Sequence, residues 1–407
     1  MIPYTLIQCT INDLDVRITD CSIYHLEFRV PEKIDTIHKI QVSFYIGKTY
    51  ESISLQNYTV EQMEQGEFFT TYRVEIEQEK YANHVRALMQ RMQDYISLKL
   101  EDQQEKITRY PVELDEIYPE SKKDLLQSMF FDLCPDSKYK EILKEKKIGI
   151  CLENPTLVDQ FLKLEWSAFQ SYYFEQACLQ NHPIRDVKIE YIYIGNSFCE
   201  HLFPNNDTLS KVIEKCRSLH LICVVVFSPM KEHNIQRYKS ILNILDSYSE
   251  VVINDLGMLE LLKESTFNVT LGVLLNKHLK DTRMQYVDLN LEHFIQNENS
   301  YNYKLSYESC GYALEHKAGS DLYFPKYQTN TASMCTMYAK CHNGNRAYQQ
   351  DVFECPRYCV SQHFLYPKHL NTIGEYNSIF GYDLRSLQES DYLEKISENA
   401  ERMIVSV

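Results

Sequence analysis

The chain has 407 residues; 44% are apolar, and 42 Lys and Arg stand against 57 Asp and Glu, for a formal charge of -15. This length and apolar content predict two domains with sizeable cores. The acidic balance repels phosphate backbones, so we do not expect non-specific nucleic-acid binding. The longest purely apolar run, 221–227, is far shorter than the roughly twenty residues that cross a bilayer, so no membrane span is expected.

Residues 1–100 predict a small all-β barrel domain with a C-terminal helix. The segments 40–46 and 72–76 alternate apolar and polar residues, which is typical of half-buried strands. From Tyr81 the period changes to that of a helix, and one apolar stripe then runs along it. The stripe consists of Val85, Leu88, Met89, Met92, Tyr95 and Ile96.

Asp20-Cys21-Ser22, followed by strand-like segments at 26–30 and 40–46, resembles a PilZ-type barrel. The cyclic-dinucleotide motif of that family has paired arginines before the Asp-x-Ser segment and a glycine after it. Here Arg17 stands alone, and His25 or Leu26 takes the place of the glycine. A lone arginine cannot grip two phosphates, so we expect this PilZ-like domain to dock a protein partner through residues 1–100 or to be purely structural.

Residues 101–146 are charged and contain three prolines, which predicts a linker with short helices. From residue 147 onward, short runs rich in Ile and Val alternate with amphipathic segments, which is typical of βαβ units. The strand candidates are 148–152, 188–194, 221–227, 251–254 and 268–273, with further candidates near Lys304, Leu322 and Met334. Residues 147–407 are therefore expected to form an α/β fold, a (β/α)8 TIM-type barrel with a C-terminal cysteine cluster, with an open doubly wound sheet as the alternative.

Four cysteines form the most informative pattern: Cys341, Cys355 and Cys359 are crowded together, and Cys199 follows a predicted barrel strand. Loops after barrel strands open on one face, which brings distant residues together. The chain start lacks the basic segment and apolar run of a secretory leader, so we expect a cytoplasmic protein whose thiols stay reduced or bind metal. The spacing predicts a metal or iron-sulfur site.

The run Val251-Val-Ile-Asn254-Asp255-Leu-Gly257, with Gly272 and Asn276 after the next strand, resembles peptidase family U-32, the collagenase-like peptidases. The turn before Cys199 and the spacing of the other three cysteines are similar to the UbiU/UbiV-type branch of that family. The resemblance covers about residues 147–370. It implies a 4Fe-4S cluster held by Cys199, Cys341, Cys355 and Cys359.

Two questions about the ligand set stay open from the residues. Cys335 lies six residues before Cys341 and is either a substitute ligand or a core thiol. A zinc site is the alternative to a cluster, and His342 or His363 can replace a cysteine in it.

Asn254 and Asp255 are the candidate catalytic residues, because they end the predicted fourth strand on the face where barrel active sites lie. Asp255 is equally placed to cap the following helix. Asn276 ends the fifth predicted strand in a similar position.

The resemblance implies an iron-sulfur enzyme or enzyme component that supports O2-independent hydroxylation or a related modification, acting on a small-molecule, nucleobase or peptide substrate. A peptidase or peptide-modification partner is one alternative, although no nucleophile and base pair is visible in the sequence. A non-catalytic scaffold with a structural zinc site is the other, so the sequence leaves enzymatic activity undecided.

Overall fold

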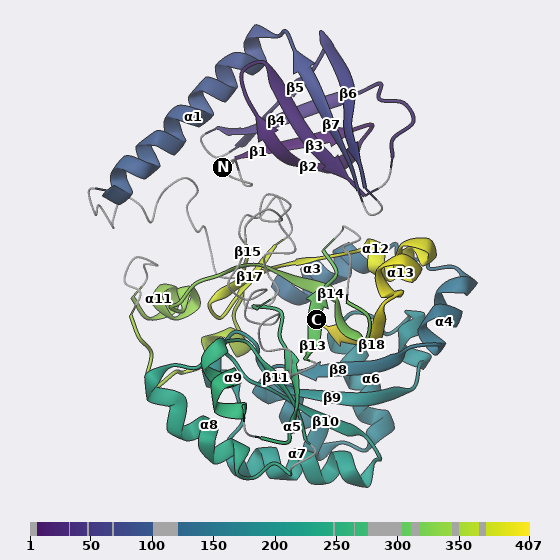
Figure 1. The fold of residues 1–407 in the computed structure, drawn as a ribbon, viewed down its shortest axis with the longest axis vertical. Helices are drawn as coiled ribbons and strands as arrows, with labels where there is room; N and C mark the ends of the chain where they lie inside the picture. Colours follow the sequence, from purple (N-terminus) through teal and green to yellow (C-terminus); the bar gives the residue numbers. More distant parts are fainter. Residues whose placement is uncertain are drawn as a thin grey trace. The chain divides into compact units, whose positions relative to one another are not determined.

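The computed structural model describes residues 6–31, 33–46, 49–66, 69–100, 121–246, 249–263, 265–275, 303–310, 317–343, 350–365 and 372–407. The chain divides into two compact units: Met1–Glu116 with Tyr366–Leu370, and Ile117–Leu365 with Asn371–Val407. Figure 1 shows both units. None of the described helices is both long enough and apolar enough to cross a membrane.

The first unit is an antiparallel sheet followed by a helix. Its seven strands have the spatial order β5-β4-β1-β2-β3-β7-β6. Its elements are β1 (Ile7–Ile11), β2 (Leu14–Cys21), β3 (His25–Val30), β4 (Ile40–Ile46), β5 (Thr49–Ser54), β6 (Tyr58–Gln65), β7 (Thr70–Ile76) and α1 (Glu79–Leu100). The predicted all-β domain with a C-terminal helix is confirmed.

One face of this sheet packs on α1. The inward residues of β4, which include Val42 and Phe44, share a core with Tyr81, Val85 and Leu88 of α1. Met89, predicted to lie on the same stripe, is 38% exposed. The packed stripe of α1 is therefore narrower than the sequence pattern indicated.

The second unit contains a closed barrel of eight parallel strands. Their order is β13-β12-β11-β10-β9-β8-β18-β14, and pairing of β13 with β14 closes the ring. The strands are β8 (Lys147–Leu152), β9 (Ile189–Gly195), β10 (Ile222–Val226), β11 (Glu250–Ile253), β12 (Asn268–Leu271), β13 (Lys304–Glu308), β14 (Ser320–Thr331) and β18 (Ala400–Ser406). The predicted (β/α)8 barrel is confirmed.

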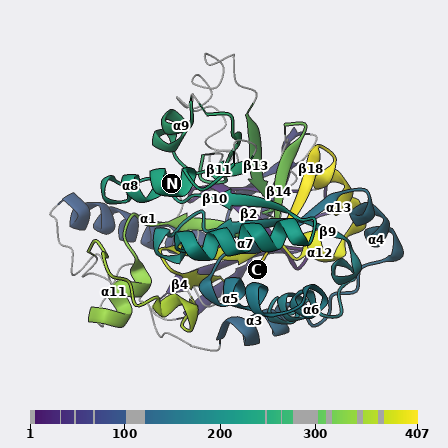
Figure 2. The ribbon, with the colours of Figure 1, turned by 90° about the horizontal axis from the view of Figure 1, so that it is seen from below.

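Helices surround the barrel strands, and α7 lies against the outside of β10 (Figures 1 and 2). The helices of this unit are α3 (Ser121–Phe130), α4 (Ser137–Lys144), α5 (Pro155–Lys163), α6 (Trp166–Gln176), α7 (Asn206–Ser218), α8 (Ile235–Leu242), α9 (Leu256–Leu262), α11 (Thr336–Asn343), α12 (Arg385–Gln388) and α13 (Ser390–Ser397). Short 3-10 turns are η1 (Pro183–Asp186), η2 (Glu200–Leu202), η3 (Glu232–Asn234) and η6 (Tyr358–Val360).

Inward side chains of the strands fill the barrel. Apolar and aromatic residues form most of this core: Cys151, Tyr191, Tyr193, Val224, Val226, Val252, Val273, Tyr323 and Ile404. Asp321 is fully buried among them, where it accepts a hydrogen bond from the hydroxyl of Tyr193 at 2.7 Å. The barrel is thus a packed core rather than a channel, and chemistry belongs to the loops at its ends.

One predicted barrel strand is wrong. The segment around Met334 is a turn that leads into α11, and the eighth strand is β18 at the C-terminal end of the chain. Residues 121–146 of the predicted linker contribute α3 and α4 to the barrel unit, where the Tyr139 hydroxyl donates to the carbonyl of Ser386 at 2.6 Å. Residues 101–120 lie outside the described part of the chain.

A small antiparallel extension continues from β14 beyond the barrel. Strand β14 pairs with β17 (Ser378–Tyr382), which pairs with β16 (Ile373–Glu375), which in turn pairs with β15 (Phe364–Leu365). The chain between β14 and β15 carries the four C-terminal cysteines, so this extension anchors both ends of the cysteine-rich segment.

Candidate metal centre

Four thiols converge on the loops that follow the carboxyl ends of β9 and β14. Cys199 interacts electrostatically with Cys335 and Cys355; Cys359 interacts with Cys199, Cys335 and Cys355; and Cys335 interacts with Cys355. Each of the six pairs within this group is therefore close enough to interact electrostatically. We call Cys199, Cys335, Cys355 and Cys359 the thiol cluster.

Cys341, a predicted ligand, lies at the side of this cluster. The charge of Cys341 acts on Cys335, the cluster member nearest to it along the chain. The thiol of Cys341 donates to Gln362 Oε1 at 3.1 Å and contacts Met337 Sδ at 3.6 Å. The structure thus brings together three of the four predicted cysteines, and Cys335 occupies the fourth position.

Burial makes the cluster unfavourable for free thiolates. Burial and the neighbouring Cys335 raise the pKa of Cys199 to about 12, and burial raises the pKa of Cys335 to about 11. The pKa of Cys359 is raised as well, first by burial and then by the other three thiols. These three thiols release their protons together only when a nearby positive charge, such as a metal ion, offsets the cost of burial.

Backbone N–H groups point at three of the sulfurs. The N–H of Tyr338 donates to Cys335 Sγ at 3.3 Å, and the N–H of Arg357 donates to Cys355 Sγ at 3.4 Å. The backbones of His201 and Leu202 hydrogen-bond to Cys199 and lower its pKa against the effect of burial. Such donors stabilise the thiolate form and tune the potential of iron-sulfur ligands, so the donor set fits a thiolate-bound metal centre.

A tight turn places Cys199. The side-chain oxygen of Asn196 accepts the N–H groups of Phe198 and Cys199, both at 2.8 Å. Gly195 precedes the turn with φ +118°, and a Cβ there would lie 2.2 Å from the carbonyl oxygen of Val226. Glycine is required at this position, because the backbone bends beside the neighbouring strand.

Asn377 joins the two halves of the cluster. Its side-chain amide donates to the carbonyl of Phe198 at 3.2 Å and to the carbonyl of Ala332 at 2.9 Å. One amide group therefore fixes the loop of Cys199 against the segment that leads to Cys335. Sequence reasoning missed this residue, because Asn377 lies far from both loops along the chain.

Apolar and aromatic residues cover the cluster. Cys199 and Cys359 pack on a core of Leu202, Tyr376 and Phe380, and the rings of Phe198 and Tyr376 stack at 6.1 Å. This covering excludes water from one side of the sulfurs, as the apolar shells around metal sites do.

A buried ion network lies beside the cluster at the rim of the barrel. Lys326 is 3% exposed and pairs with Glu153 at 2.8 Å and with Glu375 at 2.9 Å. Although burial opposes it, the cations Lys122 and Lys326 hold the pKa of Glu375 well below its usual range. Glu375 in turn raises the pKa of Cys359, so this network contributes to the field at the cluster.

The two histidines of the zinc alternative are engaged elsewhere. The ring of His342 stacks on Tyr338 at 5.0 Å. His363 lies 3.5 Å from a Glu375 oxygen, and burial lowers its pKa to about 4. Neither histidine interacts with a cluster thiol in the contacts that the described residues make.

The spacing of the sulfurs also bears on the kind of centre. Within the described ranges, one group of three or more potential ligand atoms lies within 4.8 Å of one another, and it consists of Asp20, His25 and Glu27. No three sulfurs of the thiol cluster are therefore all within 4.8 Å of one another. Thiolates bound to one tetrahedral zinc ion lie about 3.8 Å apart, since each Zn–S bond is about 2.3 Å. The wider spacing fits ligands that bind separate metal atoms.

The three potential metal ligands of the first unit, Asp20, His25 and Glu27, already have protein partners. His25 contacts Asp20 through Nε2 at 3.1 Å, and Arg73 NH2 lies 3.1 Å from His25 Nδ1. Arg73 also pairs with Glu27 at 3.5 Å, so a guanidinium stands where a cation would bind. Ser22 of the PilZ-like segment accepts the N–H groups of Tyr24 and His25, which is a turn-forming role.

Asn254 and Asp255 hold neighbouring loops of the barrel. Asn254 donates to the carbonyl of Phe227 at 2.8 Å and accepts the N–H of Leu274 at 3.2 Å. Asp255 caps α9 by accepting the N–H of Met258 at 2.9 Å, and its second oxygen accepts the N–H of Met230 at 2.8 Å. These bonds give both side chains a structural role, and their catalytic role stays a prediction. Asn276 lies outside the described residues.

The chain is thus a (β/α)8 barrel protein with a thiol cluster on the carboxyl-end face of the barrel. No family model matches the sequence, and no curated protein matches it. Among solved structures it is similar to an uncharacterized Legionella protein, Lpg0364, with 14% identity and a TM-score of 0.19. That match covers 24% of this chain and 96% of the Legionella chain.

Proposed function

We propose that this protein binds a 4Fe-4S cluster through Cys199, Cys335, Cys355 and Cys359. The observation that carries the proposal is the mutual interaction of these four half-buried thiols at one end of the barrel. The backbone N–H donors to three of the sulfurs and the spacing wider than a single zinc ion requires support it. The resemblance to the UbiU/UbiV-type branch of family U-32 implies the same kind of cluster, with Cys341 where we propose Cys335.

The proposed role is that of an iron-sulfur enzyme, or a component of one, in O2-independent hydroxylation or a related modification. The cluster would supply electron transfer when bound, and a reducing compartment such as the cytoplasm would keep its ligands available. The protein's own part is to hold four thiolates, to cover one side with Phe198, Tyr376 and Phe380, and to place the Lys326 network beside them.

Anaerobic purification tests the proposal. We expect a brown protein with close to four iron and four sulfide per chain after reconstitution, and an electron paramagnetic resonance signal on reduction. Zinc should be largely absent from the same sample by elemental analysis. A colourless protein that takes up one zinc and no iron would contradict the cluster and support the zinc scaffold instead.

A further inference from the structure

A pocket of about 310 Å³ lies at the opposite end of the barrel from the thiol cluster. Glu250, Asn268 and Lys304 are the first residues of β11, β12 and β13, and all three line it. The cluster thiols instead follow the carboxyl ends of β9 and β14. The volume is at the lower end of the range of small-molecule sites, so a ligand here would be small.

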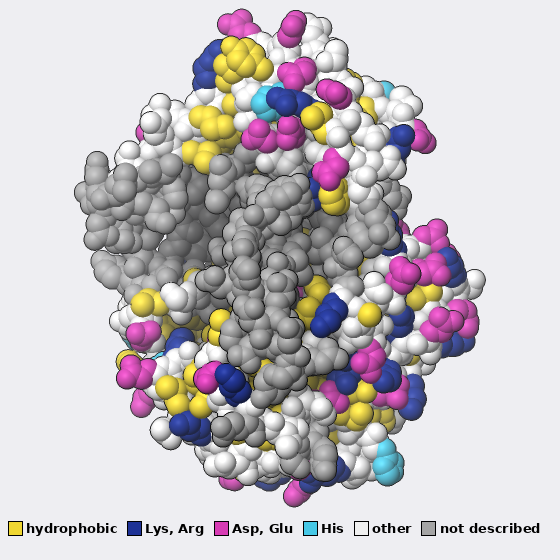
Figure 3. All heavy atoms as spheres, in the orientation of Figure 1, with side chains coloured by type: hydrophobic (Ala, Val, Ile, Leu, Met, Phe, Trp, Pro, Cys, Tyr) yellow, Lys and Arg dark blue, Asp and Glu magenta, His cyan; other side chains and the backbone are white. Residues whose placement is uncertain are grey.

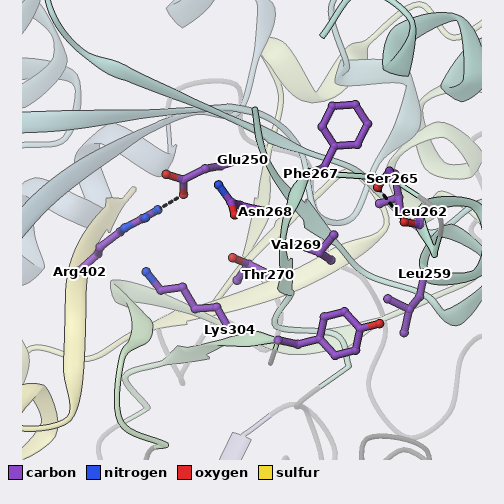
Figure 4. A pocket seen from close by; sticks show the side chains of 11 residues that line it. Glu250, Leu259, Leu262, Ser265, Phe267, Asn268, Val269, Thr270, Lys304 and Arg402 are labelled. Atoms are coloured by element: carbon purple, nitrogen blue, oxygen red, sulfur yellow. Dashed lines mark hydrogen bonds and ion pairs between the residues drawn. The ribbon is translucent and has the colours of Figure 1, made fainter. Parts of the chain in front are cut away.

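The pocket has a charged side and an apolar side. Figure 4 shows Arg402, Glu250 and Lys304 on one side, and Leu259, Leu262 and Phe267 across from them. Two cations and one carboxylate therefore face the space, while Asp321 and Glu401, the other carboxylates that pair with Lys304, are not part of the lining. This combination fits a small anion with an apolar tail.

Both cations are held in place before any ligand arrives. Arg402 contacts Glu250 at 2.5 Å and lies over the ring of Tyr191 at 4.1 Å. Lys304 pairs with Asp321 at 2.5 Å and with Glu401 at 3.1 Å. A ligand would lose little conformational entropy in ordering these side chains, which favours affinity.

The guanidinium also retains an unused donor. Arg402 is 7% exposed, and its Nε is buried without a hydrogen-bond partner among the described residues. A carboxylate oxygen of Asp321 lies 3.9 Å from this atom, beyond hydrogen-bond distance. Buried polar atoms in proteins are nearly always paired with protein, water or ligand, so this donor marks a place for an acceptor.

We propose that this pocket binds a small carboxylate with a branched apolar tail. The carboxylate accepts hydrogen bonds from Arg402 and Lys304, and the tail packs on Leu259, Leu262 and Phe267. Since catalysis in such barrels takes place at the other end, a ligand here is an effector or a stabiliser of the fold. The inference does not depend on the metal centre.

Isothermal titration calorimetry of the full chain tests this with isocaproate and its uncharged analogue isocaproamide. We expect saturable isocaproate binding and at least tenfold weaker binding of isocaproamide, which has the same tail and no charge. Equal affinity for the two compounds, or no binding of isocaproate at millimolar concentration, would overturn the proposal. This comparison uses the unmodified protein, so it does not depend on the folding of any variant.

A matched pair of variants locates the site. Asn268 is an exposed residue of the lining, so Asn268→Asp adds a negative charge to the pocket at little cost to folding. We expect it to weaken isocaproate binding at least tenfold. Asn181→Asp makes the same change at an exposed residue outside the lining and should bind as the wild type does. Wild-type affinity in Asn268→Asp would overturn this location.

Discussion

At the scale of single residues, Cys335 and Cys341 differ in the partners of their sulfur atoms. Cys335 Sγ accepts a backbone N–H, whereas the thiol of Cys341 donates to a glutamine oxygen. An acceptor of N–H bonds is prepared for the thiolate form, and a donor needs its proton. The hydrogen-bond partners therefore favour Cys335 over Cys341 as a metal ligand, a choice that spacing along the chain cannot make.

Asn377 is the residue whose loss should loosen the cluster most directly without removing a thiol. Asn377→Ala removes the bonds to Phe198 and Ala332, so we expect the free energy of unfolding to fall by about 1–3 kcal/mol. Iron should also dissociate faster from the reconstituted protein. Chemical denaturation and a chelator-release assay measure the two effects, with Asn181→Ala as the exposed control. Unchanged iron release would contradict the bridging role.

His182 should make stability depend on pH. It is buried and hydrogen-bonds to the carbonyl of Leu387 at 2.7 Å, and burial lowers its pKa from 6.5 to about 4. The unfolded state therefore binds the proton more readily, so this contribution is present above pH 6.5 and is lost as pH falls toward 4. The free energy of unfolding should fall by about 3 kcal/mol when this contribution is lost completely.

Urea denaturation between these pH values checks the effect. His182→Asn keeps a side-chain acceptor for the N–H of Ile184 at the start of η1 and removes the titrating ring. In this variant the free energy of unfolding should depend less on pH, because the titration of His182 is removed. The same slope in the variant and the wild type would show that His182 does not cause it.

At the scale of elements, the turn after β9 depends on Gly195. Gly195→Ala places a Cβ against the Val226 carbonyl at a positive φ, so we expect a loss of about 1–3 kcal/mol from backbone strain, with a further loss from the collision. Gly319→Ala is a matched control, because Gly319 also has a positive φ (+79°) but open space around its missing Cβ. Thermal melts that rank the two variants in the reverse order would contradict this account.

The start of α9 provides the test of the Asp255 assignment. Asp255→Ala removes the cap and the bond to Met230, so the free energy of unfolding should fall by about 1–2 kcal/mol. Iron content per folded chain should not change, since neither bond reaches the thiol cluster. Asp255→Asn keeps a capping oxygen and should recover most of the stability. An Asp255→Ala protein as stable as the wild type would argue against the capping role.

The sequence predicted the elements whose side-chain pattern is simple. Strand β4 was expected at 40–46 and has those bounds, because its alternation reflects one buried and one exposed face. Strand β18 was missed, because Met403, Ile404 and Val405 form only a short apolar run that is buried on both faces. The candidate near Met334 was wrong, because that segment is a turn ahead of the helix that begins at Thr336.

The candidate site was predicted in part for a similar reason. Barrel geometry explained why Cys199 would meet the C-terminal cysteines, which lie far away along the chain. Spacing could not choose between Cys335 and Cys341, since the choice depends on where α11 begins. Cys335 immediately precedes that helix, where its sulfur meets free backbone N–H groups. The Lys326 network was missed because its members come from three separate segments.

At the scale of the whole molecule, the net charge is -15, but the charged side chains are not all of one sign on the face that Figure 3 draws. In the face drawn in Figure 3, Lys and Arg side chains are interspersed with Asp and Glu. Lys138 of α4, for example, pairs with Asp391 and Glu394 of α13, both at 2.7 Å. Surface pairs of this kind contribute little stability, so the fold depends on the packed barrel core and on the closed ring of strands.

The proposed ligands lie on two loops of the barrel unit, one after β9 and one after β14, so metal binding depends on the fold that brings these loops together. Iron content in Cys335→Ser and Cys341→Ser, purified anaerobically in parallel with the wild type, tests the central claim most directly. We predict that Cys335→Ser retains less than half of the wild-type iron, while Cys341→Ser retains nearly all of it. Loss of iron in Cys341→Ser together with full iron in Cys335→Ser would contradict the ligand set.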